Sequence, residues 1–138
     1  MAFPAGTMLS FTKLLVNDLE KTAAFYKAVA GISEQHRVQS SIAGRTISEI
    51  IFEPPYQGAA SFILLKFLDA PKPTNDEVIL GFVTDDVDAF VERSEANGGT
   101  VVEAPIDQPQ HGVRVAFVTD VEGHLIEVVQ LLQAEQAA

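Results

Sequence analysis

The chain has 138 residues with a formal net charge of −10, and 47% of them are hydrophobic, which predicts a single folded domain and excludes a disordered chain. Nineteen acidic residues and nine scattered basic ones argue against nucleic-acid binding. Without cysteine there can be no disulfide or thiolate metal site, and without a long apolar run or a secretory signal we expect a cytoplasmic protein with no membrane contact.

The first half of the chain predicts one helix among four strands. A strand-like run over 9–16 ends at Asn17 and Asp18, and the Asp18 side chain is suited to cap a helix. Apolar residues then recur at helical spacing up to Gly31, a natural stop. Beyond it, turns at SSIAG and EPPYQG separate three further strands, expected over 33–39, 45–52 and 61–67.

The second half repeats this order. A strand over 78–84 leads to a cap at Asp85 and Asp86, and a helix ends at Gly98 and Gly99. Asp18 and Asp86 are 68 residues apart, as are Gly31 and Gly99. Three more strands, joined by the loop PIDQPQHG and the turn DVEG, are expected over 100–103, 113–119 and 125–131.

Each half therefore reads as a β-α-β-β-β module, which makes the fold class α+β. We expect a single domain over 1–138, with one module at 8–68, a polar linker at 69–77 and a second module at 78–131. One helix covers only one face of a four-stranded sheet. Two modules can therefore join their sheets into a curved mixed sheet around a shared cup, with the helices outside.

Three segments carry a resemblance to a known family: VNDLEKTAAFYKAVAG (16–31), LGFVTDDVDAFVERSEANGGTVV (80–102) and VAFVTDVEGHLIEVVQ (115–130). Together they resemble the vicinal oxygen chelate superfamily. This superfamily includes glyoxalase I, bleomycin-resistance proteins, extradiol dioxygenases, methylmalonyl-CoA epimerase and fosfomycin-resistance enzymes. The resemblance extends from about Leu9 to Gln130, and it implies a homodimer.

The resemblance also implies where a metal would be held. Metal enzymes of the superfamily carry His, Gln or Glu ligands on the first and last strand of each module. Here the first position falls on Phe11, the second on Leu65 or Lys66, the third on Ile79 and the fourth on Glu127. Phenylalanine, leucine and isoleucine have no donor atom, and lysine would repel a cation. We therefore expect no metal and no other cofactor.

Several polar residues remain as candidates beside these positions. Glu127 can act as a polar anchor or general base, or it can be an acid in a wet cavity paired with Lys13 or Lys66. Lys13 alternates onto the face of Phe11, where an anionic ligand, Glu127 or solvent can meet it. His111 lies in a loop expected at the mouth of the cup. We do not expect His36, His111 or His124 to bind metal, whereas Glu49 and Arg114 face either the cup or solvent.

The leading interpretation is a protein that binds a small, largely apolar molecule in a metal-free cup lined by Phe11, Leu65, Ile79 and Phe117, with Lys13 and His111 nearby. One alternative is a lyase or isomerase acting on a carbonyl compound, with Glu127 as acid or base and Lys13 as its electrostatic partner. A second alternative is an enzyme with an unusual metal site built from His111, Glu49 or His36. A third alternative is an accessory subunit that binds no ligand.

Overall fold

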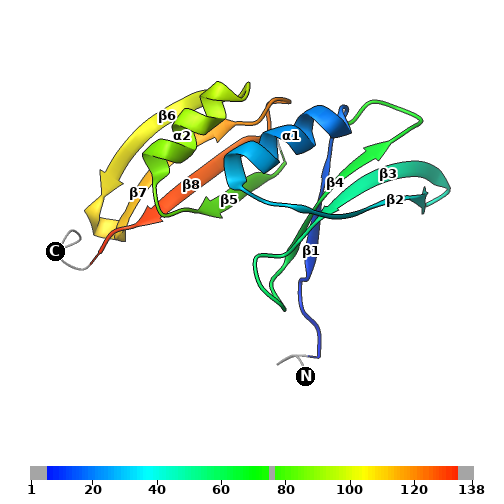
Figure 1. The fold of residues 1–138 in the computed structure, drawn as a ribbon, viewed down its shortest axis with the longest axis horizontal. Coiled ribbons are helices and arrows are strands. Elements are labelled where there is room, and N and C mark those ends of the chain that lie inside the picture. Colours follow the sequence, from blue (N-terminus) through cyan, green and yellow to red (C-terminus); the bar gives the residue numbers. More distant parts are fainter. Residues whose placement is uncertain (1–5, 75–76, 134–138) are drawn as a thin grey trace. The chain divides into compact units, whose positions relative to one another are not determined.

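The computed structural model describes residues 6–74 and 77–133, and across them the chain forms two four-stranded sheets and two α-helices (Figure 1). The first module contains β1 (Phe11–Leu15), α1 (Leu19–Ala30), β2 (Glu34–Ile42), β3 (Arg45–Phe52) and β4 (Ser61–Phe67). The second contains β5 (Ile79–Val83), α2 (Val87–Ala96), β6 (Thr100–Gln108), the short 3₁₀ helix η1 (Pro109–His111), β7 (Val113–Thr119) and β8 (Leu125–Leu131). The predicted α+β fold with two βαβββ modules is confirmed.

The two sheets share one topology. Their strand orders are β1-β4-β3-β2 and β5-β8-β7-β6. In each sheet the first strand of the module pairs in parallel with the last, as Phe11 does with Ser61 and Ile79 with Leu125. The other neighbours are antiparallel. Each sheet is therefore mixed, and the sequence repeat corresponds to a repeated architecture.

The chain divides into two compact units that do not coincide with the sequence repeat. One contains the residues up to Ala23 together with Ile32–Lys72, and the other contains Ala24–Gly31 together with the chain from Pro73 onward. Helix α1 thus begins in the first unit and ends in the second. Part of the predicted linker, residues 75–76, lies outside the described residues.

Both helices begin at the predicted aspartate but end differently. The Asp18 Oδ1 atom accepts a hydrogen bond from the Lys21 N–H at 3.0 Å, and Asp86 Oδ1 accepts one from the Ala89 N–H at 3.1 Å. Gly31 follows α1 with a positive φ of 68°. After α2 the left-handed residue is Gly98, with φ 96°, one position earlier than the repeat predicts.

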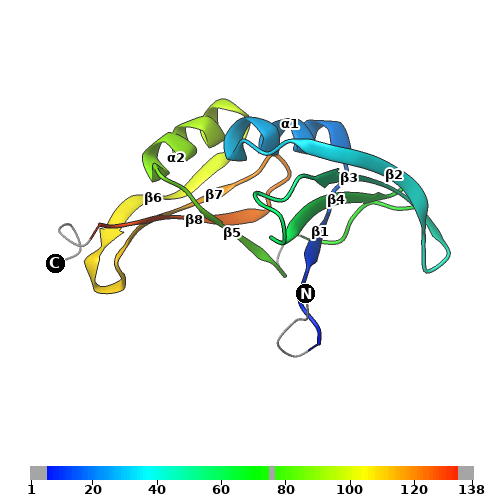
Figure 2. The ribbon, with the colours of Figure 1, turned by 60° about the horizontal axis from the view of Figure 1, so that its bottom comes forward.

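In each unit one sheet face lies against helix. In the first, Glu20 of α1 forms an ion pair with Arg37 of β2, and Arg37 is the cross-strand partner of Ile50. In the second, the Phe82 ring stacks on Tyr26 of α1 and contacts Phe90 of α2, which lies over the sheet (Figure 2). These helix-side faces hold strand residues that are at most 1% exposed, Ile50, Phe52, Leu64, Ala116, Val118, Ile126 and Val128.

Alternate strand residues point to opposite faces, so the remaining ones form a second face on each sheet, called here the helix-distal face.

Nothing longer than the 12 residues of α1 is helical in 6–74 and 77–133, and neither α-helix there is long and apolar enough to cross a membrane.

Two predicted turns are shorter than expected. Strand β2 continues to Ile42, into the segment SSIAG that is predicted to be a turn. The segment 105–112 was expected to be a loop, but β6 continues to Gln108, and only η1 and Gly112 separate it from β7. The pairing of β6 with β7 is irregular between Val101 and Glu103 and again between Glu103 and Ile106. Each irregularity interrupts the alternation of polar and apolar residues, and this hides the strand in the sequence.

Candidate functional site

The helix-distal face of the first sheet carries Phe11 and Lys13 of β1. Lys13 lies beside Ile63 of β4, and Leu65 lies beside Glu49 of β3. Strand neighbours in register share a face, so all of these residues are on the helix-distal side. Phe11 is 54% exposed, whereas Leu65 is 1% exposed and belongs to the core.

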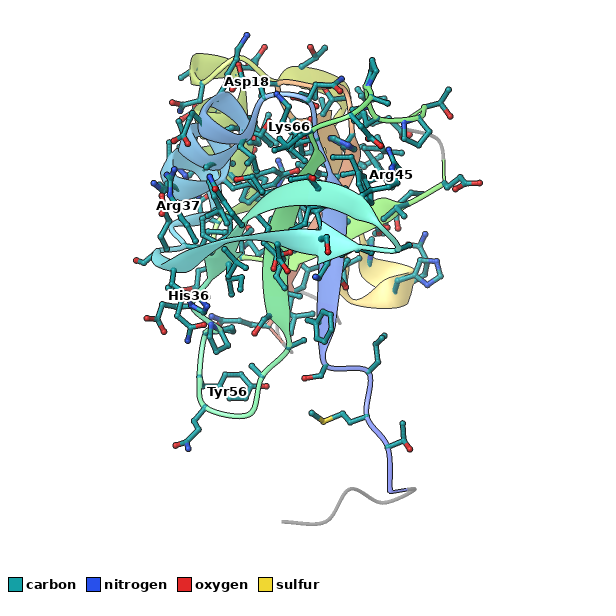
Figure 3. The ribbon with its side chains drawn as sticks, turned by 90° about the vertical axis from the view of Figure 1, so that its right-hand side faces the viewer. Asp18, His36, Arg37, Arg45, Tyr56 and Lys66 are labelled. Atoms are coloured by element: carbon teal, nitrogen blue, oxygen red, sulfur yellow. The ribbon has the colours of Figure 1, made fainter. Side chains whose placement is uncertain are left out.

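Lys66 lies on the opposite, helix-side face. There it lines a shallow cleft with Asp18, Gln39 and Ser48. Asp18 and Lys66 lie near each other in Figure 3. Of the two registers that the sequence left open, Leu65 is the residue that shares a face with Phe11.

Lys13 forms an ion pair with Glu49 across the central part of the first sheet. The Lys13 Nζ atom is 3.0 Å from Glu49 Oε1 and 5.7 Å from the centre of the Phe11 ring. Strands β1 and β3 are separated by β4, so the two side chains meet above it. The sequence left Lys13 between an anionic ligand, Glu127 and solvent, and in the structure its ion-pair partner is Glu49.

This ion pair is unequally buried. The Glu49 side chain is 8% exposed and the Lys13 side chain 30%. The Oε1 atom of Glu49 is buried without a well-aligned hydrogen bond, so its contact with Lys13 is an electrostatic attraction between opposite charges. The sequence left Glu49 facing the cup or solvent, or contributing to an unusual metal site, because its neighbours do not reveal a lysine two strands away.

The helix-distal face of the second sheet carries Glu127, in the middle of the sheet. Its neighbours in register are Gly81 of β5 and Phe117 of β7. Gly81 has no side chain, and a Cβ atom there would meet nothing within 4 Å, so there is open space beside the carboxylate. Glu127 is half-buried, and it has no hydrogen bond or ion pair within 6–74 and 77–133.

The other candidates are distributed over both faces. Ile79 shares the face of Glu127 and is 58% exposed, and Phe117 is half-buried there. His111 is exposed in η1, and His36 is exposed on β2 (Figure 3). Arg114 is on the helix side, where its guanidinium pairs with Asp88 of α2 at 2.9 Å and with Asp107 at 3.1 Å. The option that Arg114 faces the cup is therefore wrong.

A buried network that the sequence did not predict lies at the turn before β8. The Tyr26 hydroxyl donates a hydrogen bond to Asp120 Oδ2 at 2.6 Å, and His124 Nδ1 is 2.8 Å from the same oxygen. The backbone N–H groups of Glu122 and His124 donate to Oδ1. Asp120 is 2% exposed and His124 5%. The network fixes the turn that leads into the strand of Glu127.

The network shifts two pKa values in opposite senses. Burial acts to raise the pKa of Asp120, but hydrogen bonds from His124 and Tyr26 outweigh it, so this pKa lies below its ordinary value. Burial and the negative charge of Asp120 raise the pKa of Tyr26 well above its ordinary value. Asp120 therefore stays ionised and Tyr26 stays a hydrogen-bond donor around neutral pH.

The residues at the superfamily's metal positions do not fit a divalent ion. Phe11, Leu65 and Ile79 are hydrocarbon side chains, so Glu127 alone offers a donor atom. Within 6–74 and 77–133, no three His, Cys, Asp or Glu side chains cluster as an alternative site would require.

Comparison with known proteins agrees with the architecture. Residues 8–128 match the model of the Glyoxalase/Bleomycin resistance protein/Dioxygenase superfamily. The chain is 28% identical over 124 residues to a probable lactoylglutathione lyase from Vibrio cholerae, covering 89% of this chain and 90% of the relative.

Two solved structures show the same fold. A glyoxalase family protein from Bacillus cereus has a TM-score of 0.79 at 18% identity, covering 96% of this chain and all of the other. A glyoxalase/bleomycin resistance protein from Albidiferax ferrireducens has a TM-score of 0.65 at 25% identity, with 90% and 98% covered. The resemblance seen in the sequence is confirmed, and the chain belongs to the Glyoxalase/Bleomycin resistance protein/Dioxygenase superfamily.

Proposed function

We propose that this protein binds a small, largely apolar molecule on the helix-distal face of one of its sheets, without a divalent metal. The observation that carries the proposal is the pair of exposed apolar side chains, Phe11 and Ile79, at positions where metal enzymes of the superfamily hold ligands. Covering exposed apolar surface is favourable by about 25 cal/mol per Å². These side chains therefore favour an apolar ligand and offer no donor atom to a cation.

Glu127 is the polar group on the helix-distal face of the second sheet. A half-buried carboxylate without a partner is poorly solvated, and a hydrogen-bond donor on a ligand would offset that cost. The open space beside Gly81 leaves room for such a group. We therefore expect a ligand on the second sheet to carry at least one hydrogen-bond donor near its apolar body.

The test is a thermal-shift screen of the whole protein against a library of small apolar compounds, followed by calorimetry on the hits. Of Phe11→Ser and Ile79→Ser, the substitution on the sheet face that holds the ligand should weaken binding at least tenfold. Leu68→Ser is the matched control, because Leu68 is an exposed apolar residue in the turn after β4. A library without hits, or equal losses in all three variants, would contradict the proposal.

A second candidate is a metal-independent lyase or isomerase acting on a carbonyl compound, with the Glu127 carboxylate taking up and returning a proton. The absence of an ion-pair partner favours it, because such a carboxylate is available to a substrate. The name of the Vibrio relative, a probable lactoylglutathione lyase, supports a lyase reaction but does not bear on the metal.

For this candidate, Glu127→Gln should abolish turnover and leave substrate binding largely intact, since the amide keeps the shape but cannot exchange the proton. Glu92→Gln, at an exposed position of α2, is the control. A Glu127→Gln protein with unchanged turnover would rule this candidate out.

A further inference from the structure

The two partners of the ion pair, Lys13 and Glu49, differ in how far they are exposed to solvent. Glu49 is the buried partner, at 8% side-chain exposure, and its Oε1 atom is inaccessible. Lys13 is the outer partner, at 30% exposure. A molecule that approaches this face therefore meets more of the Lys13 side chain than of the Glu49 side chain.

The Lys13 ammonium has more hydrogen-bond donors than its partners in the structure take up. It carries three N–H groups, and Glu49 can take at most a part of them. Within 6–74 and 77–133 its only other contact is the Phe11 ring, whose centre lies 5.7 Å away. The remaining donors are therefore available to a ligand, beside an aromatic ring that is 54% exposed.

Glu49 makes this lysine suitable for a site that an apolar ligand covers. A lone ammonium would resist the loss of water when a ligand closed over it. A carboxylate 3.0 Å away compensates the ammonium charge when a ligand excludes water. Glu49 thus acts through Lys13, as a positioning residue.

From this arrangement we infer that the Lys13 ammonium, positioned by Glu49, binds the carboxylate of a small organic acid whose apolar body rests on Phe11. The inference rests on the proposed function and deepens it, because it names the head group of the ligand. A carboxylate matches one outward ammonium in charge and accepts its N–H groups. A cationic head group would face the wrong partner of the pair.

The test compares three probes with the same apolar body: 4-phenylbutyrate, 4-phenylbutanol and 4-phenylbutylamine, each titrated calorimetrically into the whole protein. We expect the acid to bind at least tenfold more tightly than the alcohol, and the amine to bind most weakly. If alcohol and acid bind equally, or the amine binds best, the inference fails while the proposed function stands. If none of the three binds, both fail for this class of ligand.

A double variant separates recognition from folding. Lys13→Met alone leaves Glu49 buried and unpaired, so Lys13→Met/Glu49→Gln removes both charges together. It should reduce acid binding to the level of the alcohol and leave alcohol binding unchanged. Lys21→Met, at an exposed position of α1, is the control for net charge. Undiminished acid binding by a folded double variant would overturn the inference.

Discussion

The two sheets share strand order but differ in how they handle charge. In the first, Lys13 and Glu49 lie on the strands that flank β4 and neutralise each other. The positions 68 residues further on are Gly81 and Phe117, which are uncharged. In the second sheet the charge is instead on the middle strand, where Glu127 lies between those two residues without a partner. The architecture is thus repeated, whereas the chemistry of each helix-distal face is particular to its sheet.

The largest effect is expected where the two helix ends differ. Gly31 has a positive φ and open space around it, whereas a Cβ atom at Gly99 would lie 2.3 Å from the Thr119 carbonyl oxygen. Gly99→Ala should therefore lower the free energy of unfolding by about 4 kcal/mol, because the obstacle is backbone. Urea denaturation measures this loss. Gly81→Ala, in open space, is the control, and equal losses in the two variants would contradict the close contact.

A second difference is the buried carboxylate network, which the second unit alone displays among the described residues. Asp120→Asn should cost about 2–3 kcal/mol, because it weakens charge-assisted hydrogen bonds in a buried site. The pKa of Asp120 is lowered in the folded protein, so its contribution to stability is present above the ordinary value of 3.8 and is lost as the pH falls through the lowered folded value.

The measurement is the midpoint of urea unfolding from pH 7 down to about pH 3. The wild-type protein should lose stability more steeply than Asp120→Asn below about pH 4. Parallel curves would show that Asp120 does not contribute in this way.

The third prediction concerns the ion pair of the first sheet. Lys13→Met should cost about 2 kcal/mol, since it leaves Glu49 buried and unpaired. Glu49→Leu should cost less, because the Lys13 side chain, 30% exposed, can still reach water. The double variant Lys13→Met/Glu49→Leu should recover most of the loss. A double-mutant cycle from chemical denaturation tests this, and simple additivity would contradict a coupled pair.

The smallest effect is expected at Glu127, and in the opposite direction. Glu127→Leu should raise the free energy of unfolding by about 0.5–1 kcal/mol, because it removes a half-buried carboxylate that has no partner. The same substitution at Glu49 should be destabilising. Thermal denaturation at neutral pH compares the two, and a loss of stability in both would show that Glu127 has a stabilising role.

Much of the fold could be predicted because periodicity and turn residues agree. The ranges of β3, β4, β7 and β8 coincide with the predicted strands, since each is a strongly apolar run bounded by Gly, Pro or polar turns. The register of SFILLKF could not be predicted, because both of its faces are apolar. Strand β6 was underestimated because irregular pairing breaks its alternation.

The candidate site was less predictable than the fold. Alternation along a strand reveals which positions share a face, and Lys13 was placed beside Phe11 in this way. The partner of Lys13 depends on strand order, since β3 is two strands away from β1. The hydrogen bond between Tyr26 and Asp120 joins residues that are 94 positions apart, and no local pattern indicates such a contact.

The division of α1 between the two units has a consequence for how the chain can be cut. A fragment that starts at Pro73 would lack Tyr26, so Asp120 would lose a hydrogen-bond donor and Phe82 its stacking partner. A fragment that ends at Lys72 would carry the C-terminal half of α1 without the residues it packs on. Neither sequence module therefore contains all the residues of a compact unit, and we do not expect either module to fold stably by itself.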